Sequence, residues 1–200
     1  MKTTTLERDT RSTILATGQK LMSHKGFSAV GLTEVLSEAR VPKGSFYHYF
    51  ASKDAFGEAM LSAYFEEYLA DIDALMARPG LTGAERLMLY FASWRENQGA
   101  FDCQGRCLAV KLGAEVSDLS EAMRLALKSG THNIIARMRT MVESGIADGS
   151  VEVTAPAGDV AANLYYQWLG ASVMVKIVRT HDPFETALAF TRTVLGIGKR

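Results

Sequence analysis

Apolar side chains recur every three or four residues along most of the chain, and this spacing predicts helices rather than strands. Pro79-Gly80 interrupts the pattern, and Asp118 with Glu121 three residues later predicts an N-cap for a long helix. The predicted helices cover residues 8–25, 32–39, 45–50, 53–77, 81–98, 105–116, 118–147, 157–179 and 183–195. The sequence therefore predicts an all-α fold.

The segment from Val41 to Lys53 carries the strongest functional signal in the sequence. A short helix here would bury Phe46 and Phe50, with Tyr49 buried in part, and its other face would carry hydrogen-bond donors. A second short amphipathic helix precedes it, and a proline marks the tight turn between them. Two short helices with a polar and aromatic outer face are typical of a helix-turn-helix DNA reader, although an ordinary helix pair in a bundle is the alternative.

This segment resembles the N-terminal domain of the tetracycline-repressor (TetR) family. The resemblance rests on Phe46-Tyr47-His48-Tyr49-Phe50 followed by Lys53, on Lys25-Gly26-Phe27 at the end of the first helix, and on Leu32-Thr33 at the start of the second. Tyr49 departs from the histidine that is frequent in the family, but it can still donate to a phosphate. The resemblance implies a three-helix head in residues 1–52, with its motif at about 31–50, and a larger helical domain in residues 53–200 for ligand binding and dimerisation.

The resemblance also implies which side chains of the head contact DNA. Base edges in the major groove would be approached by Lys43, Gly44, Ser45, Tyr47 and His48, where the glycine lets the backbone come close. Phosphates would be held by Thr33, Tyr47, Tyr49 and Lys53, which would fix the register on the duplex.

Charge is distributed unevenly, although the whole chain has a formal net charge of zero. Residues 1–53 hold eight Lys/Arg and four Asp/Glu, a net of +4, and the remainder holds 14 basic and 18 acidic residues, a net of −4. A basic head on an acidic body agrees with phosphate binding confined to the head. The N-terminal segment lacks an apolar signal sequence and no run resembles a membrane span, so we expect a cytoplasmic protein with cysteines in the thiol form.

The predicted helix at 157–179 is apolar on two sides. One stripe runs through Val160, Leu164, Trp168, Ala171, Val175 and Val178, and the second side carries Tyr165, Tyr166, Leu169 and Val173. A helix that is apolar nearly all round must be covered on both sides, either by the core alone or by the core and a partner. In the TetR family the last two helices form a four-helix dimer interface, which implies a homodimer through helices at about 157–179 and 183–195.

Bulky, adaptable side chains are frequent in the middle helices. The family resemblance implies a ligand cavity there, and the candidate lining residues are Phe91, Trp94, Met138, Tyr165 and Trp168. The alternative is that these side chains are simply core.

Cys107 and Lys176 are the candidate sensing residues. Cys107 lies near a predicted helix start with Lys111 one turn later, a setting that favours the reactive thiolate. Lys176 is the only charged residue between Asp159 and Arg179. The alternatives are an inert buried thiol and a lysine paired at the helix end.

The run from Cys107 to Arg124, together with Trp168-Leu169-Gly170-Ala171 and Lys176, resembles a branch of the TetR family that senses reactive electrophiles and oxidants. In that branch the cysteine that matches Cys107 is the sensor, which implies the same role here. The segment Cys103-Gln104-Gly105-Arg106 departs from the branch, and Cys103 is extra. The four histidines are scattered, so we predict no metal site.

The sequence therefore predicts a dimeric DNA-binding repressor that releases a palindromic operator when its C-terminal domain is modified or liganded. It holds no Gly-rich phosphate loop and no motif-placed catalytic set, so we predict neither an enzyme nor a cofactor. Two alternatives stay open: a repressor that responds to a reversible small ligand without a role for the cysteine, and a helical protein-interaction module without specific DNA binding.

Overall fold

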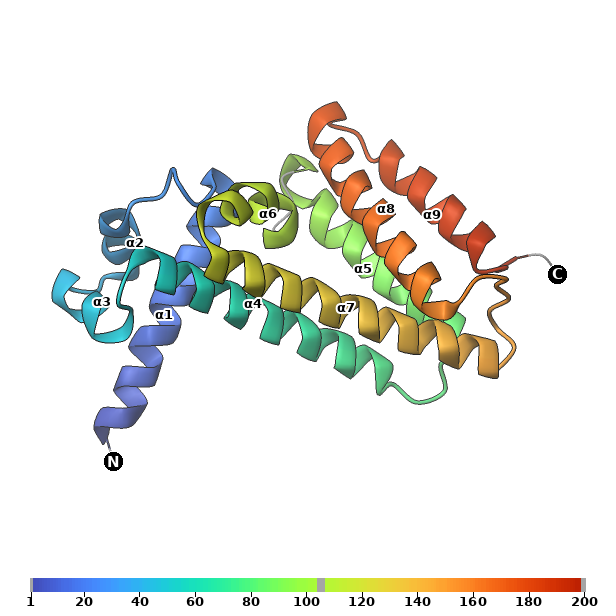
Figure 1. Cartoon of the computed structure of the whole chain (residues 1–200), viewed down its shortest axis with the longest axis horizontal. Helices are drawn as coiled ribbons and strands as arrows, with labels where there is room; N and C mark the ends of the chain where they lie inside the picture. The colour runs from blue at the N-terminus through green and yellow to red at the C-terminus, as the bar shows by residue number, and fades with distance from the viewer. Residues whose placement is uncertain (1, 104–106, 199–200) are drawn as a thin grey trace. The chain divides into compact units, whose positions relative to one another are not determined.

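The computed structural model describes residues 2–103 and 107–198, and the side chains of residues 10–97 and 107–198. All regular secondary structure in these ranges is helical (Figure 1), which confirms the all-α prediction. The helices are α1 (Lys2–Lys25), α2 (Leu32–Ala39), α3 (Lys43–Tyr49), α4 (Lys53–Met76), α5 (Gly83–Cys103), α6 (Leu108–Leu119), α7 (Glu121–Ala147), α8 (Ala157–Val178) and α9 (Asp182–Val194). Among the described helices, none combines the length and the apolar character that crossing a bilayer requires.

The predicted N-cap at Asp118 is wrong. Helix α6 continues through Asp118 to Leu119, and Ser120 separates it from α7. The Ser120 hydroxyl accepts a hydrogen bond from the Met123 amide at 3.5 Å, so the serine takes the capping position. Both residues are good caps, and the Ser120 N–H donates to the Val116 carbonyl at 3.0 Å, which closes the last turn of α6 beyond the aspartate.

The chain forms two compact units. The first, here the head unit, comprises residues 1–67 and 106–130, and the second, the body unit, comprises residues 68–105 and 131–200. Helices α4 and α7 therefore each contribute residues to both units. The functional boundary after residue 52 stays a prediction, because compactness groups α6 and the first part of α7 with the DNA-reading motif.

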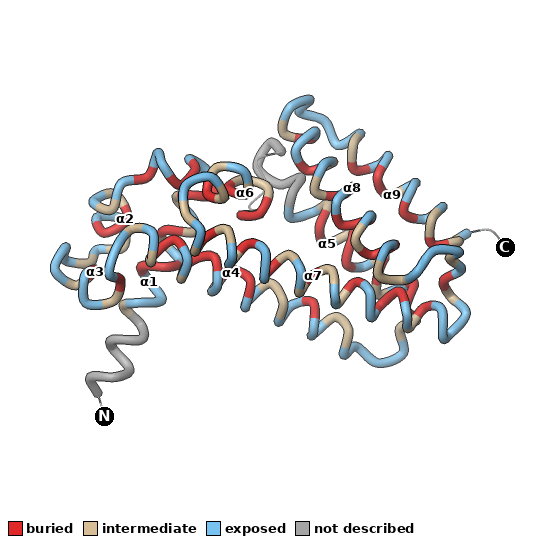
Figure 2. Tube along the Cα trace, viewed as in Figure 1, coloured by how far each residue is buried: buried red, intermediate tan, exposed pale blue. Residues whose placement is uncertain are grey.

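The core of the head unit contains aromatic and methionine side chains. Figure 2 shows the buried positions of its helices in red. Met22, Phe46, Phe56 and Met60 are fully buried. Gly57 allows α4 to pack closely, since a Cβ at this position would lie 2.4 Å from the Met123 sulfur and 2.7 Å from the Phe27 ring. The head is therefore supported by Met123 of α7, which is distant in sequence.

The core of the body unit is an aromatic cluster between α5, α8 and α9. The ring of Trp168 stacks on Phe91 at 4.6 Å and on Phe184 at 5.8 Å between centroids. The indole N–H of Trp94 donates to the Ser172 hydroxyl at 2.9 Å, and that of Trp168 donates to Thr191 at the same distance. Each buried indole therefore has its hydrogen-bond partner, as close packing requires.

Candidate DNA-binding and sensing sites

The turn between α2 and α3 has a well-defined geometry. Arg40 adopts a left-handed conformation with φ of 55°, and its N–H bonds back to the carbonyls of the last turn of α2. The Val41 N–H donates to the Leu36 carbonyl at 2.9 Å, and Pro42 with φ of −59° precedes α3. Helix α2 therefore stops sharply, and α3 begins in a direction fixed by the backbone.

The inner face of α3 is fixed by ring packing. The Phe46 side chain is fully buried, with its ring centroid 5.2 Å from Phe50 and 5.7 Å from Phe56. The Arg11 guanidinium lies over the Phe50 ring at 5.4 Å, which adds a cation–π contact from α1. This packing confirms that Phe46 and Phe50 are buried, and it determines which side chains of α3 point outward.

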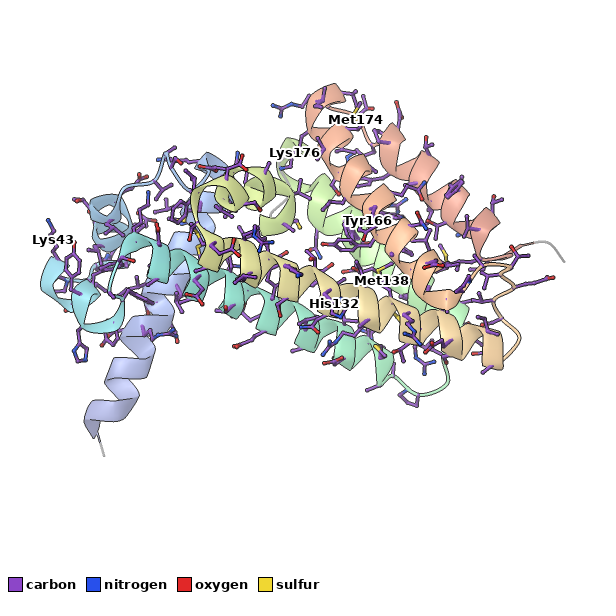
Figure 3. The ribbon with its side chains drawn as sticks, in the orientation of Figure 1. Lys43, His132, Met138, Tyr166, Met174 and Lys176 are labelled. Atoms are coloured by element: carbon purple, nitrogen blue, oxygen red, sulfur yellow. The ribbon has the colours of Figure 1, made fainter. Side chains whose placement is uncertain are left out.

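The predicted base-reading residues lie on or beside the outer face of α3. Lys43, Gly44 and His48 are exposed, Tyr47 is 58% exposed, and Ser45 is half-buried. Lys43 stands at the first turn of α3 (Figure 3). An exposed tyrosine beside exposed donors is suited to phosphate and base-edge contacts, and their DNA roles stay predictions.

Besides Tyr47, the predicted phosphate contacts are Thr33 on α2, Tyr49 on α3 and Lys53, which has contacts within the head. Thr33 is exposed at the start of α2, and Tyr49 is half-buried. The half-buried Lys53 donates from Nζ to the Phe27 carbonyl at 2.9 Å, with Nζ 4.6 Å from the centroid of the Phe27 ring. Lys53 therefore also ties α4 to the segment between α1 and α2, a role that its position in the motif does not reveal.

Glu115 is a functional candidate that the sequence pattern did not identify. From α6 its carboxylate accepts hydrogen bonds from the backbone N–H of Phe27 at 3.1 Å and of Ser28 at 2.7 Å. Burial opposes ionisation, but the bonds from Ser28 and Phe27 and the charge of Lys111 outweigh it and hold the pKa of Glu115 below its usual range. The carboxylate is therefore ionised at neutral pH and can accept both bonds.

The two predicted sensing residues belong to different units. Cys107 is a half-buried free thiol at the N-cap of α6 in the head unit, and Lys111 follows one turn later. Lys176 is half-buried on α8 in the body unit, where it has interactions of its own. A direct pairing of the two side chains stays a prediction. The side chain of Cys103 and the residues Gln104, Gly105 and Arg106 lie outside the described residues.

The predicted pocket residues are all buried in the body unit, but only some of them line a hollow. A cleft of about 580 Å³ between α5, α8 and α9 is bordered by Phe91 and Trp168. Arg95 and Arg192 also line it, and the Arg95 guanidinium forms an ion pair with Glu185 at 2.9 Å. Trp94, Met138 and Tyr165 do not line this cleft and pack within the core, so as a set the five residues do not enclose one cavity.

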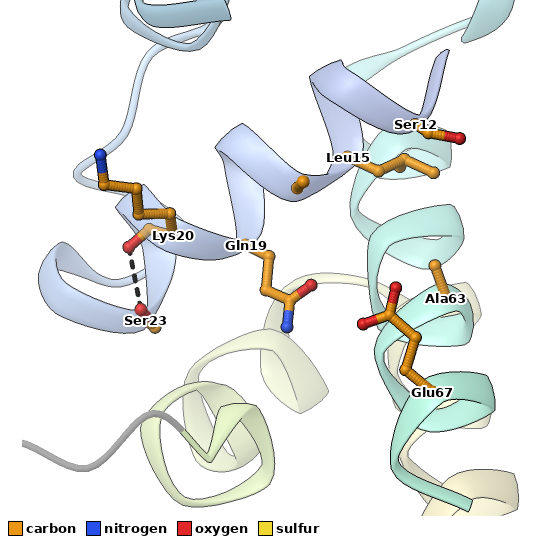
Figure 4. A pocket seen from close by; sticks show the side chains of 8 residues that line it. Ser12, Leu15, Gln19, Lys20, Ser23, Ala63 and Glu67 are labelled. Carbon is orange, nitrogen blue, oxygen red and sulfur yellow. Dashed lines mark hydrogen bonds between the residues drawn. The ribbon is translucent and has the colours of Figure 1, made fainter. Parts of the chain in front are cut away.

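Two further hollows lie within single units. In the body unit, a groove of about 450 Å³ follows α4 and α5 and includes Tyr68 and Tyr90, whose hydroxyls are 3.3 Å apart. In the head unit, a hollow of about 310 Å³ lies between α1 and α4 and is lined by polar side chains such as Gln19 and Glu67 (Figure 4). Its mixed polar lining gives no clear ligand chemistry.

An apolar face of α8 and α9 is left uncovered within one chain. Tyr166 is 61% exposed and Ile177 is 65% exposed on α8, and Phe190 is 53% exposed on α9. Figure 3 shows Tyr166 and Met174 along α8. Val178, which the periodicity placed with the core stripe, is also exposed. Tyr165, which the periodicity placed on the second side, is buried with the core, so the open side of α8 comprises only part of the predicted second side, with Tyr166 and Val173 exposed.

Comparison with known proteins gives matches over nearly the whole chain. Residues 14–60 match the model of bacterial regulatory proteins of the tetR family, and residues 83–191 match the tetracyclin repressor-like C-terminal domain. The HTH-type transcriptional repressor NemR of Escherichia coli (strain K12) is 39% identical over 189 residues, which are 94% of this chain and 95% of the relative.

A second relative and a solved structure are also similar over most of the chain. The transcriptional regulator AcuR of Cereibacter sphaeroides is 31% identical over 180 residues, which are 90% of this chain and 81% of the relative. The crystal structure of E. coli NemR in its reduced form aligns with a TM-score of 0.90 at 38% identity, covering 96% of this chain and all of that chain. The similarity therefore includes both the reading motif and the C-terminal helices.

Proposed function

Because the chain belongs to the TetR family of bacterial regulatory proteins and is a DNA-binding transcriptional repressor rather than an enzyme, we propose that it reads a palindromic operator as a homodimer and releases it when Cys107 is modified. The observation that supports DNA reading most directly is the outer face of α3. Lys43, Tyr47 and His48 are exposed there, although the same helix is anchored through fully buried Phe46. Since operators are cytoplasmic in bacteria, the protein would act in the cytoplasm.

Within the head, we divide the contacts by chemistry. Side chains on the outer face of α3 would approach base edges in the major groove. Thr33, Tyr47, Tyr49 and Lys53 would hold phosphates on either side of the groove. The Lys53 ammonium group donates to the Phe27 carbonyl. To hold a phosphate, it would either make both contacts at once or exchange the carbonyl for the phosphate.

Lys53→Ala and Tyr47→Phe should each weaken binding to operator and to unrelated DNA alike, because phosphate contacts carry no sequence information. The lysine variant should also flatten the slope of log affinity against log salt by about one unit, which one released counterion predicts. Fluorescence anisotropy at several salt concentrations measures both effects.

Lys128→Ala, which removes an exposed lysine from α7, serves as the matched control and should leave the slope unchanged. If Lys53→Ala keeps the parental slope, the side chain acts only through its contact with Phe27.

The dimer is supported by the uncovered apolar face of α8 and α9. Tyr166, Ile177 and Phe190 are each more than half exposed in a single chain, an arrangement that a partner copy would bury. A two-fold dimer also matches the symmetry of a palindromic operator. We therefore assign the interface to α8 and α9.

Ile177→Glu should convert the dimer to monomers at micromolar concentration, because it places a charge in the centre of the proposed apolar contact. Sedimentation velocity measures the change, and operator affinity should fall in parallel. Leu125→Glu introduces the same charged side chain at an exposed leucine of α7 and should leave the dimer intact. A dimeric Ile177→Glu protein would exclude this interface.

The sensing step is proposed to be covalent. The Cys107 thiolate adds to the carbon–carbon double bond of an electrophile such as a maleimide, a sulfur–carbon bond replaces the π bond, and a proton from water completes the adduct. With hypochlorite, the thiol is oxidised to a sulfenic acid and chloride is released. Lys176 would either stabilise the thiolate by its charge or, as a neutral amine, condense with the sulfenic acid to a sulfur–nitrogen bond with loss of water.

A reversible ligand is the second candidate for the signal, and the cleft between α5, α8 and α9 favours it. A mainly apolar lining that includes Phe91 and Trp168, together with the charged side chains of Arg95 and Arg192, suits a small amphipathic molecule. Covalent sensing predicts an adduct of defined mass on Cys107 when operator is released. Release without any change in mass would support the reversible ligand instead.

A further inference from the structure

Glu115 joins α6 to the segment that connects α1 and α2. Helix α1 ends at Lys25, so the N–H groups of Phe27 and Ser28 have left the helix, and both donate to the Glu115 carboxylate. Gly26 turns the chain with φ of +92°, and a Cβ on it would lie 3.0 Å from a carboxylate oxygen of Glu115. The carboxylate is therefore in close contact with the whole turn.

The same turn is held from two other helices. Lys53 of α4 donates to the Phe27 carbonyl at 2.9 Å, and Lys25 forms an ion pair with Glu34 of α2. Since Phe27 is buried, donates to Glu115 of α6 and accepts from Lys53 of α4, its backbone position depends on both helices. A shift of α6 relative to α4 would pull on this residue directly.

Helix α6 carries the proposed sensing thiol at one end and Glu115 further along. The two hydrogen bonds from the N–H groups of Phe27 and Ser28 to the Glu115 carboxylate are here called the clamp. Cys107 is its N-cap, and the Lys111 N–H closes the first turn on the Cys107 carbonyl at 3.0 Å. Glu115 is eight residues later, which corresponds to about 12 Å along a helix axis. Both groups therefore lie on one short, continuous helix within the head unit.

We propose that Glu115 is a positioning residue for DNA reading: its carboxylate transmits the position of α6 to the α1–α2 turn, and disturbance of the α6 N-terminus at Cys107 loosens that clamp. The low pKa of Glu115 agrees with this role, because only the ionised carboxylate accepts both N–H bonds at full strength. The link to Cys107 rests on the proposed function, and the clamp itself does not. If Glu115 only stabilised the turn locally, its two hydrogen bonds would not change when the α6 N-terminus is disturbed.

Amide hydrogen exchange at Phe27 and Ser28 tests the proposal in the DNA-free full-length protein. Labelling Cys107 with N-ethylmaleimide, verified by mass, should speed exchange at both amides about tenfold in the parent. In Glu115→Gln the two amides should exchange rapidly before labelling, and labelling should then change them less than about twofold. Asp118→Asn, which removes one charge from an exposed position on the same helix, should behave as the parent does.

A second variant keeps the test independent of cysteine chemistry. Leu108 is fully buried at the first position of α6, so Leu108→Ala should loosen the helix start and speed exchange at Phe27 and Ser28 in the parent but not in Glu115→Gln. Unchanged exchange at both amides, after labelling and in Leu108→Ala, would overturn the proposal. Changed exchange without release of operator by the labelled parent would instead keep the clamp and contradict the proposed sensing function.

Discussion

Gly83→Ala should lower the free energy of unfolding of the body unit by about 3 kcal/mol or more. A Cβ at Gly83 would lie 2.1 Å from the backbone nitrogen of Gly145, 2.4 Å from its Cα and 2.7 Å from the Met141 carbonyl. These atoms belong to the backbone of α7, so no side-chain rotation can relieve the clash. Urea denaturation followed by circular dichroism measures the loss.

The matched control is Gly158→Ala in the first turn of α8. Its added Cβ would meet only the Arg139 side chain, at an ordinary distance of 3.7 Å. We expect a change within about 0.5 kcal/mol for this variant. Equal stability of the Gly83→Ala protein and the parent would show that α5 and α7 are not packed backbone to backbone.

The same junction contains a pH-dependent contact. Hydrogen bonds from Ser150 and from the Gly83 N–H hold the pKa of Asp148 below its usual range. A depressed carboxyl pKa stabilises the fold above the unfolded-state value near 4, and this contribution disappears as the pH falls through the lower folded-state value. The α5–α7 junction should therefore weaken in acid.

Cys107→Ser should bind operator as the parent does but lose its response to electrophiles. Treatment of the parent with N-ethylmaleimide should reduce operator affinity about 100-fold, near the upper end of typical coupling between sites. The serine hydroxyl preserves the N-cap position of α6 and cannot form the thioether adduct. Anisotropy titration before and after treatment, with mass analysis of the adduct, measures the difference.

Two controls accompany this variant. Cys103→Ser should respond as the parent does, because Cys107 is the proposed sensor. Lys176→Ala should keep operator binding and respond abnormally: a change with hypochlorite alone indicates the sulfur–nitrogen bond, and a change with maleimide as well indicates stabilisation of the thiolate. Release of the Cys107→Ser protein by maleimide to the same extent as the parent would make the cysteine a core residue and favour the reversible ligand.

The reading motif could be predicted from the sequence because its signals are local. Phe46 and Phe50 at four-residue spacing, with Pro42 before them, predict a short helix and its buried face, and the structure begins α3 within two residues of the expected start. Periodicity also predicted that α8 is apolar on more than one side, but it assigned Tyr165 and Val178 to the wrong sides, since it cannot tell which apolar positions the core covers.

The missing parts of the site depend on contacts between distant residues. Glu115 lies 87 residues from Ser28, and nothing in the local pattern distinguishes it from an exposed acid. Likewise, spacing predicted that Trp94, Met138 and Tyr165 are buried but could not tell a packed core from a cavity wall.

The shift of the N-cap from Asp118 to Ser120 has a local cause, because both residues are competent caps.

Sedimentation velocity of the parent protein on labelled DNA from upstream of its own gene tests whether modification of Cys107 releases an intact dimer from its operator. We expect one dimer on a palindromic fragment and, after maleimide treatment, free DNA and an intact free dimer carrying one adduct on each Cys107. A repressor dimer spans half-sites about 34 Å apart, so release requires only that its heads no longer fit successive major grooves. A complex that survives full labelling of Cys107, or release that coincides with dissociation into monomers, would contradict this expectation.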